Sequence, residues 1–140
     1  MYPARSQPLE EFSVTATLMV RATAYNSLPE QTDSDPFTTA RGTLARWGVI
    51  AVSRDLLAGA LPYGTLVRIR DLGGSAGRSV SGDHDHLLEG IFVVEDTMHP
   101  RKRNQIDLWF ESHRDALRWG VREVRVEIVR PGRATTAWAR

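Results

Sequence analysis

Two aspartates separated by a basic segment have the clearest capacity for chemistry in this chain. Asp96 ends one predicted strand and Asp107 lies inside the next, and Arg101, Lys102 and Arg103 stand between them. A hairpin can bring two such carboxylates close together, where their repulsion and partial burial raise one pKa. A carboxyl group that keeps its proton near neutral pH can protonate a poor leaving oxygen, as cleavage of a glycosidic bond requires.

Both aspartates also have an ordinary structural interpretation. An aspartate at the end of a strand often caps a turn, and the residue pattern alone favours this interpretation for Asp96. Asp107 is harder to explain in this way, because it lies within the apolar segment 106–110. A carboxylate in apolar surroundings is costly unless it is paired with another group or used in a site.

The run Asp83-His84-Asp85-His86 suggests a different kind of site, because alternating Asp and His can bind zinc or another divalent metal. Its flanks are rich in glycine, whereas a metal site needs rigid surroundings. A solvated loop explains the run better, and the sequence predicts neither a bound metal nor a cofactor. The chain has no cysteine, which excludes thiolate metal sites and a disulfide framework.

Aromatic side chains could supply a platform on which a sugar ring stacks. Trp109 and Phe110 are adjacent in a predicted strand, so they should face opposite sides, one buried and one exposed. Trp119 is expected to pack in the core, and Tyr25 and Trp47 complete the aromatic set.

The hydrophobic pattern predicts the strands that must position these residues. Apolar and polar residues alternate from Ser13 to Ala24, which is typical of a strand exposed on one face. Shorter strands are predicted at 49–52, 66–71, 90–96, 106–110 and 124–128. Six short strands without a repeating strand-helix-strand order favour a small closed barrel over a sandwich or a parallel sheet.

The rest of the chain is predicted to form one short helix, long loops and two tails. The helix should run from about His113 to Trp119, with Ser112 as its N-cap, and 54–60 could form a single helical turn. Loops are expected at 26–48 and 72–89, the second of them flexible. The domain is assigned to 13–130, with tails at 1–12 and 131–140.

Composition limits the classes of partner. The 140 residues suit one domain, and 18 basic against 17 acidic residues give a net charge of +1. No global field therefore points to nucleic acid. No apolar run approaches the ~20 residues that a membrane-spanning helix needs. The first residues contain no visible signal peptide, and nothing in the sequence determines the oligomeric state.

Several short motifs follow one another in a characteristic order. They are Ala24-Tyr25, Thr39-Ala40-x-Gly42, Ile50-Ala51-Val52, Leu61-Pro62-x-Gly64-Thr65, Gly90-x-Phe92-x-Val94-x-Asp96-Thr97, Ile106-Asp107 and Ala116-x-x-Trp119-Gly120. In this order the chain resembles the 3D domain family, named for three aspartates, over roughly residues 17–129. The catalytic barrel of membrane-bound lytic transglycosylase A belongs to the same family.

The resemblance implies a mainly β fold, a six-stranded double-psi β-barrel. It also implies cleavage of peptidoglycan between N-acetylmuramic acid and N-acetylglucosamine, leaving a 1,6-anhydro end, and a location in the periplasm or cell envelope. Asp107 falls on the family's catalytic aspartate, which acts as acid and then as base, and Asp96 falls on the supporting aspartate. The residues expected to bind the glycan are Tyr25, Thr39, Gly42, Lys102 and Trp109.

A second interpretation is a non-catalytic glycan-binding or scaffold module on the same barrel. The family has Gly-Gly after Asp96-Thr97, where this chain has Met98-His99. Ser53 stands at the position of the family's third aspartate, which is either absent or displaced to Asp55 or, less well, Asp35. Side chains in place of glycines could keep a saccharide from approaching the backbone, which favours the second interpretation. A metal-dependent enzyme using the Asp-His run, and a cytoplasmic barrel with an unrelated ligand, remain as further alternatives.

Overall fold

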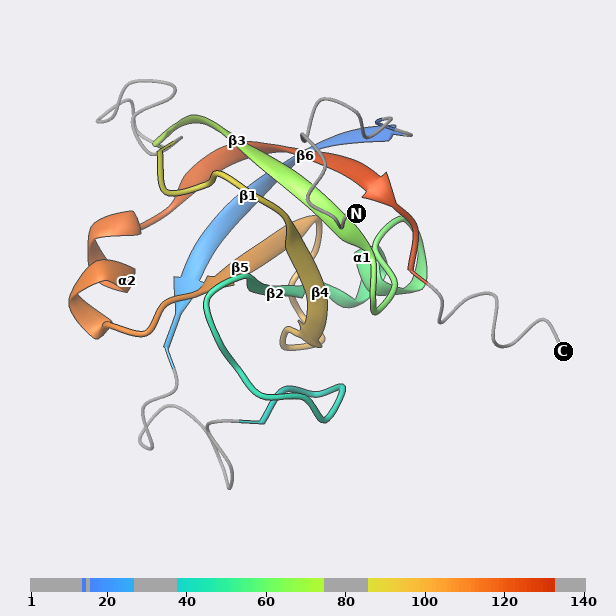
Figure 1. Ribbon diagram of the computed structural model, residues 1–140, viewed down its shortest axis with the longest axis horizontal. Coiled ribbons are helices and arrows are strands. Elements are labelled where there is room, and N and C mark those ends of the chain that lie inside the picture. The colour runs from blue at the N-terminus through green and yellow to red at the C-terminus, as the bar shows by residue number, and fades with distance from the viewer. Residues whose placement is uncertain (1–13, 15, 27–37, 75–85, 133–140) are drawn as a thin grey trace, which may run out of the picture.

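The structure is a computed structural model, and it describes residues 14, 16–26, 38–74 and 86–132. Its elements in chain order are β1 (Ala16–Tyr25), β2 (Val49–Val52), α1 (Arg54–Ala58), β3 (Leu66–Gly74), β4 (Phe92–Thr97), β5 (Gln105–Trp109), α2 (His113–Trp119) and β6 (Arg122–Arg130). The six strands close in a ring in the order β1-β5-β2-β4-β3-β6 (Figure 1). The prediction of a mainly β, six-stranded, closed structure is therefore confirmed.

The ring combines strands that are far apart in the sequence. β1 runs parallel to β5 and β2 runs parallel to β4, whereas the other four neighbouring pairs are antiparallel. In Figure 1, β1, β3 and β6 form one side of the ring, and β2, β4 and β5 form the other. This order places β1, β5, β2 and β4 next to one another, and these four strands carry the candidate site.

The core fills the ring with the apolar residues that alternate along each strand. Val20 and Ala22 of β1, Ile106 and Leu108 of β5, and Val94 of β4 are fully buried there. α2 covers one end of the ring, where the buried indole of Trp119 donates a hydrogen bond from Nε1 to the Ala22 carbonyl at 3.1 Å. The core position predicted for Trp119 is confirmed.

The helices follow local sequence signals. The Ser112 side chain accepts a hydrogen bond from the Asp115 backbone N–H at 3.3 Å, and α2 ends at Gly120, which has a φ of 65°. Both ends agree with the predicted boundaries. The helical turn predicted at 54–60 is confirmed as α1, which ends at Gly59, so the described residues form two short helices and not the single one expected. Among the described helices, none is long and apolar enough to cross a membrane.

β3 extends into the segment that was predicted as a loop. Gly73 and Gly74 continue its pairing with β6, opposite Glu123 and Arg122. The extension is held by a buried ion pair, in which the Arg122 guanidinium binds both carboxylate oxygens of Asp71 at 2.9 and 2.7 Å. Residues 75–85 of the predicted loop lie outside the described residues, and 86–88 form a turn.

Candidate functional site

Two carboxylates share one row on the outward face of four adjacent strands. Thr23 of β1 pairs with Asp107 of β5, Asp107 pairs with Ala51 of β2, and Ala51 pairs with Asp96 of β4. Side chains that are paired in this way point to the same face of the sheet. The carboxylates are thus two strand spacings apart, about 10 Å between Cα atoms at ~4.8 Å per spacing. We call these four residues the acidic row.

The acidic row corrects the expected hairpin. β4 and β5 follow one another in the chain but are not neighbours in the ring, because β2 lies between them and pairs with both. Only the methyl group of Ala51 therefore separates Asp96 from Asp107 along the row. A larger side chain at this position would fill the space between the two carboxylates.

Asp107 is held by a chain of polar groups. The Thr23 hydroxyl donates to Oδ1 of Asp107, and Gln105 Nε2 donates to that hydroxyl at 3.0 Å. Burial raises the pKa of the Asp107 carboxyl and the charge of Asp96 adds to the increase, while the Thr23 hydrogen bond and the charge of Lys102 oppose it. None of the described residues donates a hydrogen bond to Oδ2 of Asp107. This oxygen is available to a ligand.

Asp96 is bound through both of its oxygens. The backbone N–H groups of Ala40 and Thr97 donate to Oδ1 at 2.8 and 3.0 Å, and the Tyr25 hydroxyl donates to Oδ2 at 3.1 Å. The contact with Thr97 is the local cap that the sequence favours for an aspartate in this place. The contacts with Ala40 and Tyr25 come from distant segments and fix the carboxylate on the outward face.

Tyr25 lies close to both carboxylates. Burial raises the pKa of its hydroxyl above the usual value, and the negative charge of Asp96, the hydrogen bond to it and the charge of Asp107 act in the same direction. The hydroxyl therefore keeps its proton and serves as a hydrogen-bond donor. Burial and the negative charge of Asp96 also raise the pKa of the Tyr63 hydroxyl.

Thr39 and Gly42 shape the loop that contacts Asp96. The buried Thr39 hydroxyl lies 2.8 Å from the Thr43 hydroxyl, which donates to Glu95 Oε1 at 2.5 Å. Gly42 has a φ of 94° and closes a turn by donating its N–H to the Thr39 carbonyl at 2.9 Å. This turn presents the Ala40 N–H to Asp96, so both predicted binding residues position the site from within the loop.

Trp109 and Lys102 differ in their access to solvent. Trp109 is on the outward face, in register with Tyr25, yet only 8 % of it is exposed, and Phe110 on the core side is 5 % exposed. The expectation that one of these two rings is exposed is therefore wrong, because the outward face is itself covered at this point. Lys102 is exposed and acts on Asp107 through its charge.

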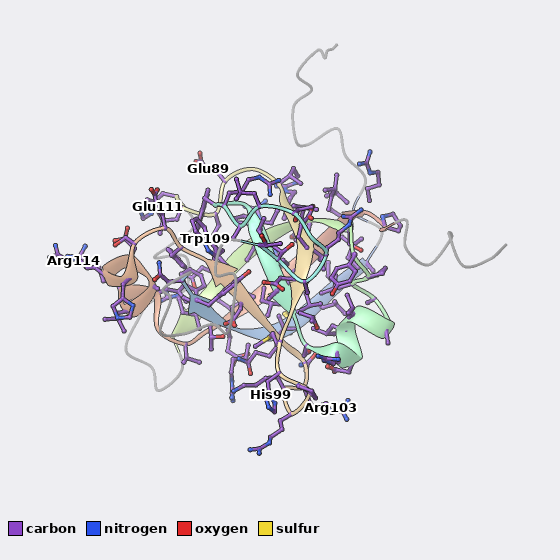
Figure 2. All side chains as sticks on the ribbon, turned by 90° about the horizontal axis from the view of Figure 1, so that it is seen from below. Glu89, His99, Arg103, Trp109, Glu111 and Arg114 are labelled. Carbon is purple, nitrogen blue, oxygen red and sulfur yellow. The ribbon has the colours of Figure 1, made fainter. Side chains whose placement is uncertain are left out.

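Met98 and His99 occupy the positions at which the resembled 3D family has Gly-Gly. Met98 is buried and donates its N–H to the Val52 carbonyl at 3.0 Å, so its side chain packs into the protein. His99 is exposed, and its Nδ1 accepts from the Arg101 N–H at 3.0 Å. Figure 2 shows His99 and Arg103 projecting together from the loop between β4 and β5.

Two site residues were not singled out from the sequence. Thr23 and Gln105 orient Asp107, and the alternation along β1 does place Thr23 on the polar face of its strand. Their contact with Asp107 depends on the parallel pairing of β1 with β5, which no local pattern shows.

The described part of the chain contains no cluster of side chains that could bind a metal ion. Asp83, His84 and Asp85 lie outside it, and His86 is exposed. Within 14, 16–26, 38–74 and 86–132, no three His, Asp or Glu side chains are grouped as metal ligands would be. His86 instead borders a cleft of about 510 Å³ between Trp47 and α2, which no residue of the acidic row lines.

Comparison with solved structures identifies a similar fold. No family model matches the chain, and neither does any curated protein. The apo expansin of Clavibacter michiganensis is similar with a TM-score of 0.50 and 22 % identity, over 82 % of this chain and 51 % of the expansin. A mutant of that expansin in complex with cellohexaose gives a TM-score of 0.49 and 20 % identity over the same shares. The chain thus spans about half the length of the expansins, with which it shares a fold.

Proposed function

We propose that the chain is a glycan-binding module whose ligand lies along the acidic row. The observation that carries the proposal is the presence of two carboxylates in one partly exposed row, with Asp107 Oδ2 open to a ligand. Carboxylate oxygens accept hydrogen bonds from hydroxyl groups, which sugar rings present on every side. A few fixed polar groups on a rigid sheet are what a binding site needs to orient such a ligand.

The expansin-like fold supports this proposal at the level of architecture only. We infer that the ring has double-psi connectivity, since it contains the parallel pairs β1–β5 and β2–β4 among antiparallel neighbours. The resemblance to the 3D family favours peptidoglycan as the glycan, and with it a location in the periplasm or bacterial cell envelope.

Sedimentation with insoluble glycans tests the proposal directly. Purified peptidoglycan sacculi, chitin and cellulose are incubated with the protein, and cellohexaose is titrated as a defined neutral probe. Asp107→Asn should bind within about threefold of wild type, because an amide oxygen still accepts a hydrogen bond, whereas Asp107→Leu should lose about tenfold in affinity. Arg114→Gln, an exposed substitution on α2, serves as the control. Equal binding by wild type and Asp107→Leu would contradict the proposal.

A second candidate function is cleavage of the bound glycan, favoured by the raised pKa of Asp107. The Asp107 carboxyl would give its proton to the glycosidic oxygen as the bond from that oxygen to C1 of the sugar breaks. The resulting carboxylate would then take the proton of the same sugar's C6 hydroxyl, whose oxygen bonds to C1. No water is consumed, and the product carries a 1,6-anhydro end.

Mass spectrometry of digested peptidoglycan separates cleavage from binding. Anhydro-ended fragments from wild type, absent with Asp107→Asn, would establish cleavage with Asp107 as acid and base. Reducing ends would instead indicate hydrolysis, and a water would have to enter the reaction. No fragments from a protein that still sediments with sacculi would leave the glycan-binding module as the function.

A further inference from the structure

A polar cavity of about 280 Å³ lies beside the acidic row. We call it the arginine notch, and it is lined by Arg21, Arg103, Asn104, Gln105 and Glu123. Its side chains come from β1, β5 and β6 and from the loop between β4 and β5. The lining carries two arginines against one glutamate, which gives it an excess of positive charge.

The notch continues the outward face that carries the acidic row. Arg21 and Gln105 are paired, and two residues further along the same strands Thr23 and Asp107 are paired. Side chains two residues apart on a strand point to the same face, about 7 Å apart at ~3.3 Å per residue. Gln105 connects the arginine notch to the acidic row, because its Nε2 donates to the Thr23 hydroxyl that binds Asp107.

The wall of the notch is fixed by backbone contacts. The Gln105 N–H donates to Ser53 Oγ at 3.1 Å, and the Gln105 side chain is almost fully buried. Asn104 adopts a left-handed conformation with a φ of 51°, which asparagine tolerates better than most residues. Its N–H donates to Asp55 Oδ2 at 3.0 Å and its Nδ2 donates to the Met19 carbonyl at 3.3 Å.

The two arginines at the notch have charge available for a ligand. Arg21 and Arg103 are exposed, and neither forms an ion pair with the described residues. A guanidinium group binds a carboxylate through two parallel hydrogen bonds, which gives both affinity and orientation. Asp96 and Asp107 would repel an anion placed directly in the acidic row. An acidic group of a ligand would therefore lie at the notch, while its neutral hydroxyl groups face the row.

We propose that the arginine notch binds a carboxylate carried by the glycan strand, so that the module prefers an acidic glycan to a neutral one. The proposal rests on the glycan-binding function proposed above and adds the chemical class of the ligand. Arg21 and Arg103 hold the carboxylate, and Gln105 and Asn104 form the polar wall of the site. The preference weakens at high salt, because exposed charges are screened.

Sacculi with and without free carboxylates test the notch. One portion is stripped of phosphate polymers, and half of that portion is then amidated so that its carboxylates become neutral. We expect amidation to lower wild-type affinity by about tenfold. Arg21→Gln/Arg103→Gln should bind both preparations with the same, weaker affinity. Arg114→Gln should behave like wild type, since Figure 2 shows Arg114 well apart from Arg103. Thermal melting confirms that each variant is folded.

The outcomes separate this proposal from the one on which it rests. If wild type binds free and amidated sacculi equally, carboxylate binding at the arginine notch is overturned while glycan binding stands. The same holds if the double arginine variant still prefers sacculi with free carboxylates. The proposal is also overturned if wild-type affinity falls when the phosphate polymers are removed but does not change on amidation, because the bound anion is then a phosphate. Absence of wild-type binding to every sacculus preparation and to cellohexaose overturns the glycan-binding function itself.

Discussion

The hydroxyl of Tyr25 donates to Oδ2 of Asp96 at 3.1 Å, although β5 and β2 lie between the strands that carry them. The tyrosine side chain therefore reaches across the acidic row from its first strand to its last. Because the pKa of Tyr25 is raised, the phenol keeps its proton and can donate to Asp96.

Removal of the Tyr25 hydroxyl should weaken glycan binding and the fold by similar, modest amounts. Tyr25→Phe leaves Asp96 with its two backbone donors, so the carboxylate loses one restraint on its orientation. We expect a loss of roughly threefold to tenfold in affinity for sacculi and of about 1 kcal/mol in the free energy of unfolding. Sedimentation and urea denaturation measure the two quantities. Tyr63→Phe is the matched control, and an equal loss of affinity there would argue against a specific role for Tyr25.

Asp107 should make the protein less stable as the pH rises. Its folded-state pKa lies above the usual value of 3.8, so folding favours the protonated carboxyl. Below the unfolded pKa the carboxyl is protonated in both states, and this advantage is fully present. It is lost as the pH rises through the folded pKa. The melting temperature of Asp107→Asn should therefore exceed that of wild type near pH 7, and the difference should shrink towards about pH 3.

Asp55 provides a control of opposite sign. Hydrogen bonds lower the pKa of Asp55, chiefly the one with the Ser53 side chain, so its contribution is present above the unfolded pKa. That contribution is lost as the pH falls through the folded pKa. Asp55→Asn should lower the melting temperature at neutral pH and have little effect in acid. If the melting temperatures of Asp107→Asn and Asp55→Asn, each relative to wild type, changed in the same direction with pH, the opposite pKa shifts given to these two carboxyl groups would be contradicted.

The buried ion pair between Asp71 and Arg122 should be the most sensitive point of the fold. Both side chains are at most 2 % exposed, and the guanidinium also lies 5.6 Å from the ring centre of Trp119. Asp71→Asn removes the charge that compensates a buried guanidinium, which typically costs about 3–5 kcal/mol. Urea denaturation measures the loss. Asp71→Leu combined with Arg122→Met should be less destabilising than Asp71→Asn, because no uncompensated charge remains.

Gly132 should not tolerate a side chain. It is buried two residues beyond β6, and its N–H donates to Thr65 Oγ1 at 3.0 Å. A Cβ atom there would lie 2.3 Å from the Tyr63 carbonyl oxygen and 2.8 Å from that of Pro62. Gly132→Ala should therefore destabilise the protein by about 1–3 kcal/mol in thermal or urea unfolding.

Gly90 separates the effect of space from that of backbone conformation. Its φ is +95°, and a Cβ atom there would meet nothing within 4 Å. Gly90→Ala should show only the cost of a left-handed conformation, about 1–2 kcal/mol. A Gly132→Ala variant as stable as wild type would show that the chain after β6 packs differently.

Local signals predicted the elements better than their arrangement. β2 and α2 begin and end where the sequence indicates, because a short apolar run and a capped, glycine-ended helix are encoded by adjacent residues. The end of β3 was missed because it depends on pairing with β6, about fifty residues away in the chain. Likewise, the insertion of β2 between β4 and β5 is a long-range property of the ring.

The same limit applies to the candidate site. Asp107 was singled out because a carboxylate in an apolar segment needs an explanation. The structure explains it by placing the side chain on the outward face, in the acidic row. The sequence could not show that Thr23 would orient it, nor that Arg21 would lie beside Gln105 at the edge of the notch. These contacts exist only through the pairing of β1 with β5.

The order of strands in the ring has a consequence for synthesis of the chain on the ribosome. β1 emerges first, yet both of its partners, β5 and β6, emerge near the end. Until β6 is made, β1 and β3 keep unpaired edges, which are surfaces for aggregation. The nascent chain must therefore wait for its last strand before it can fold. A ribosome that stalls before 122–130 should release a product that proteases or chaperones remove.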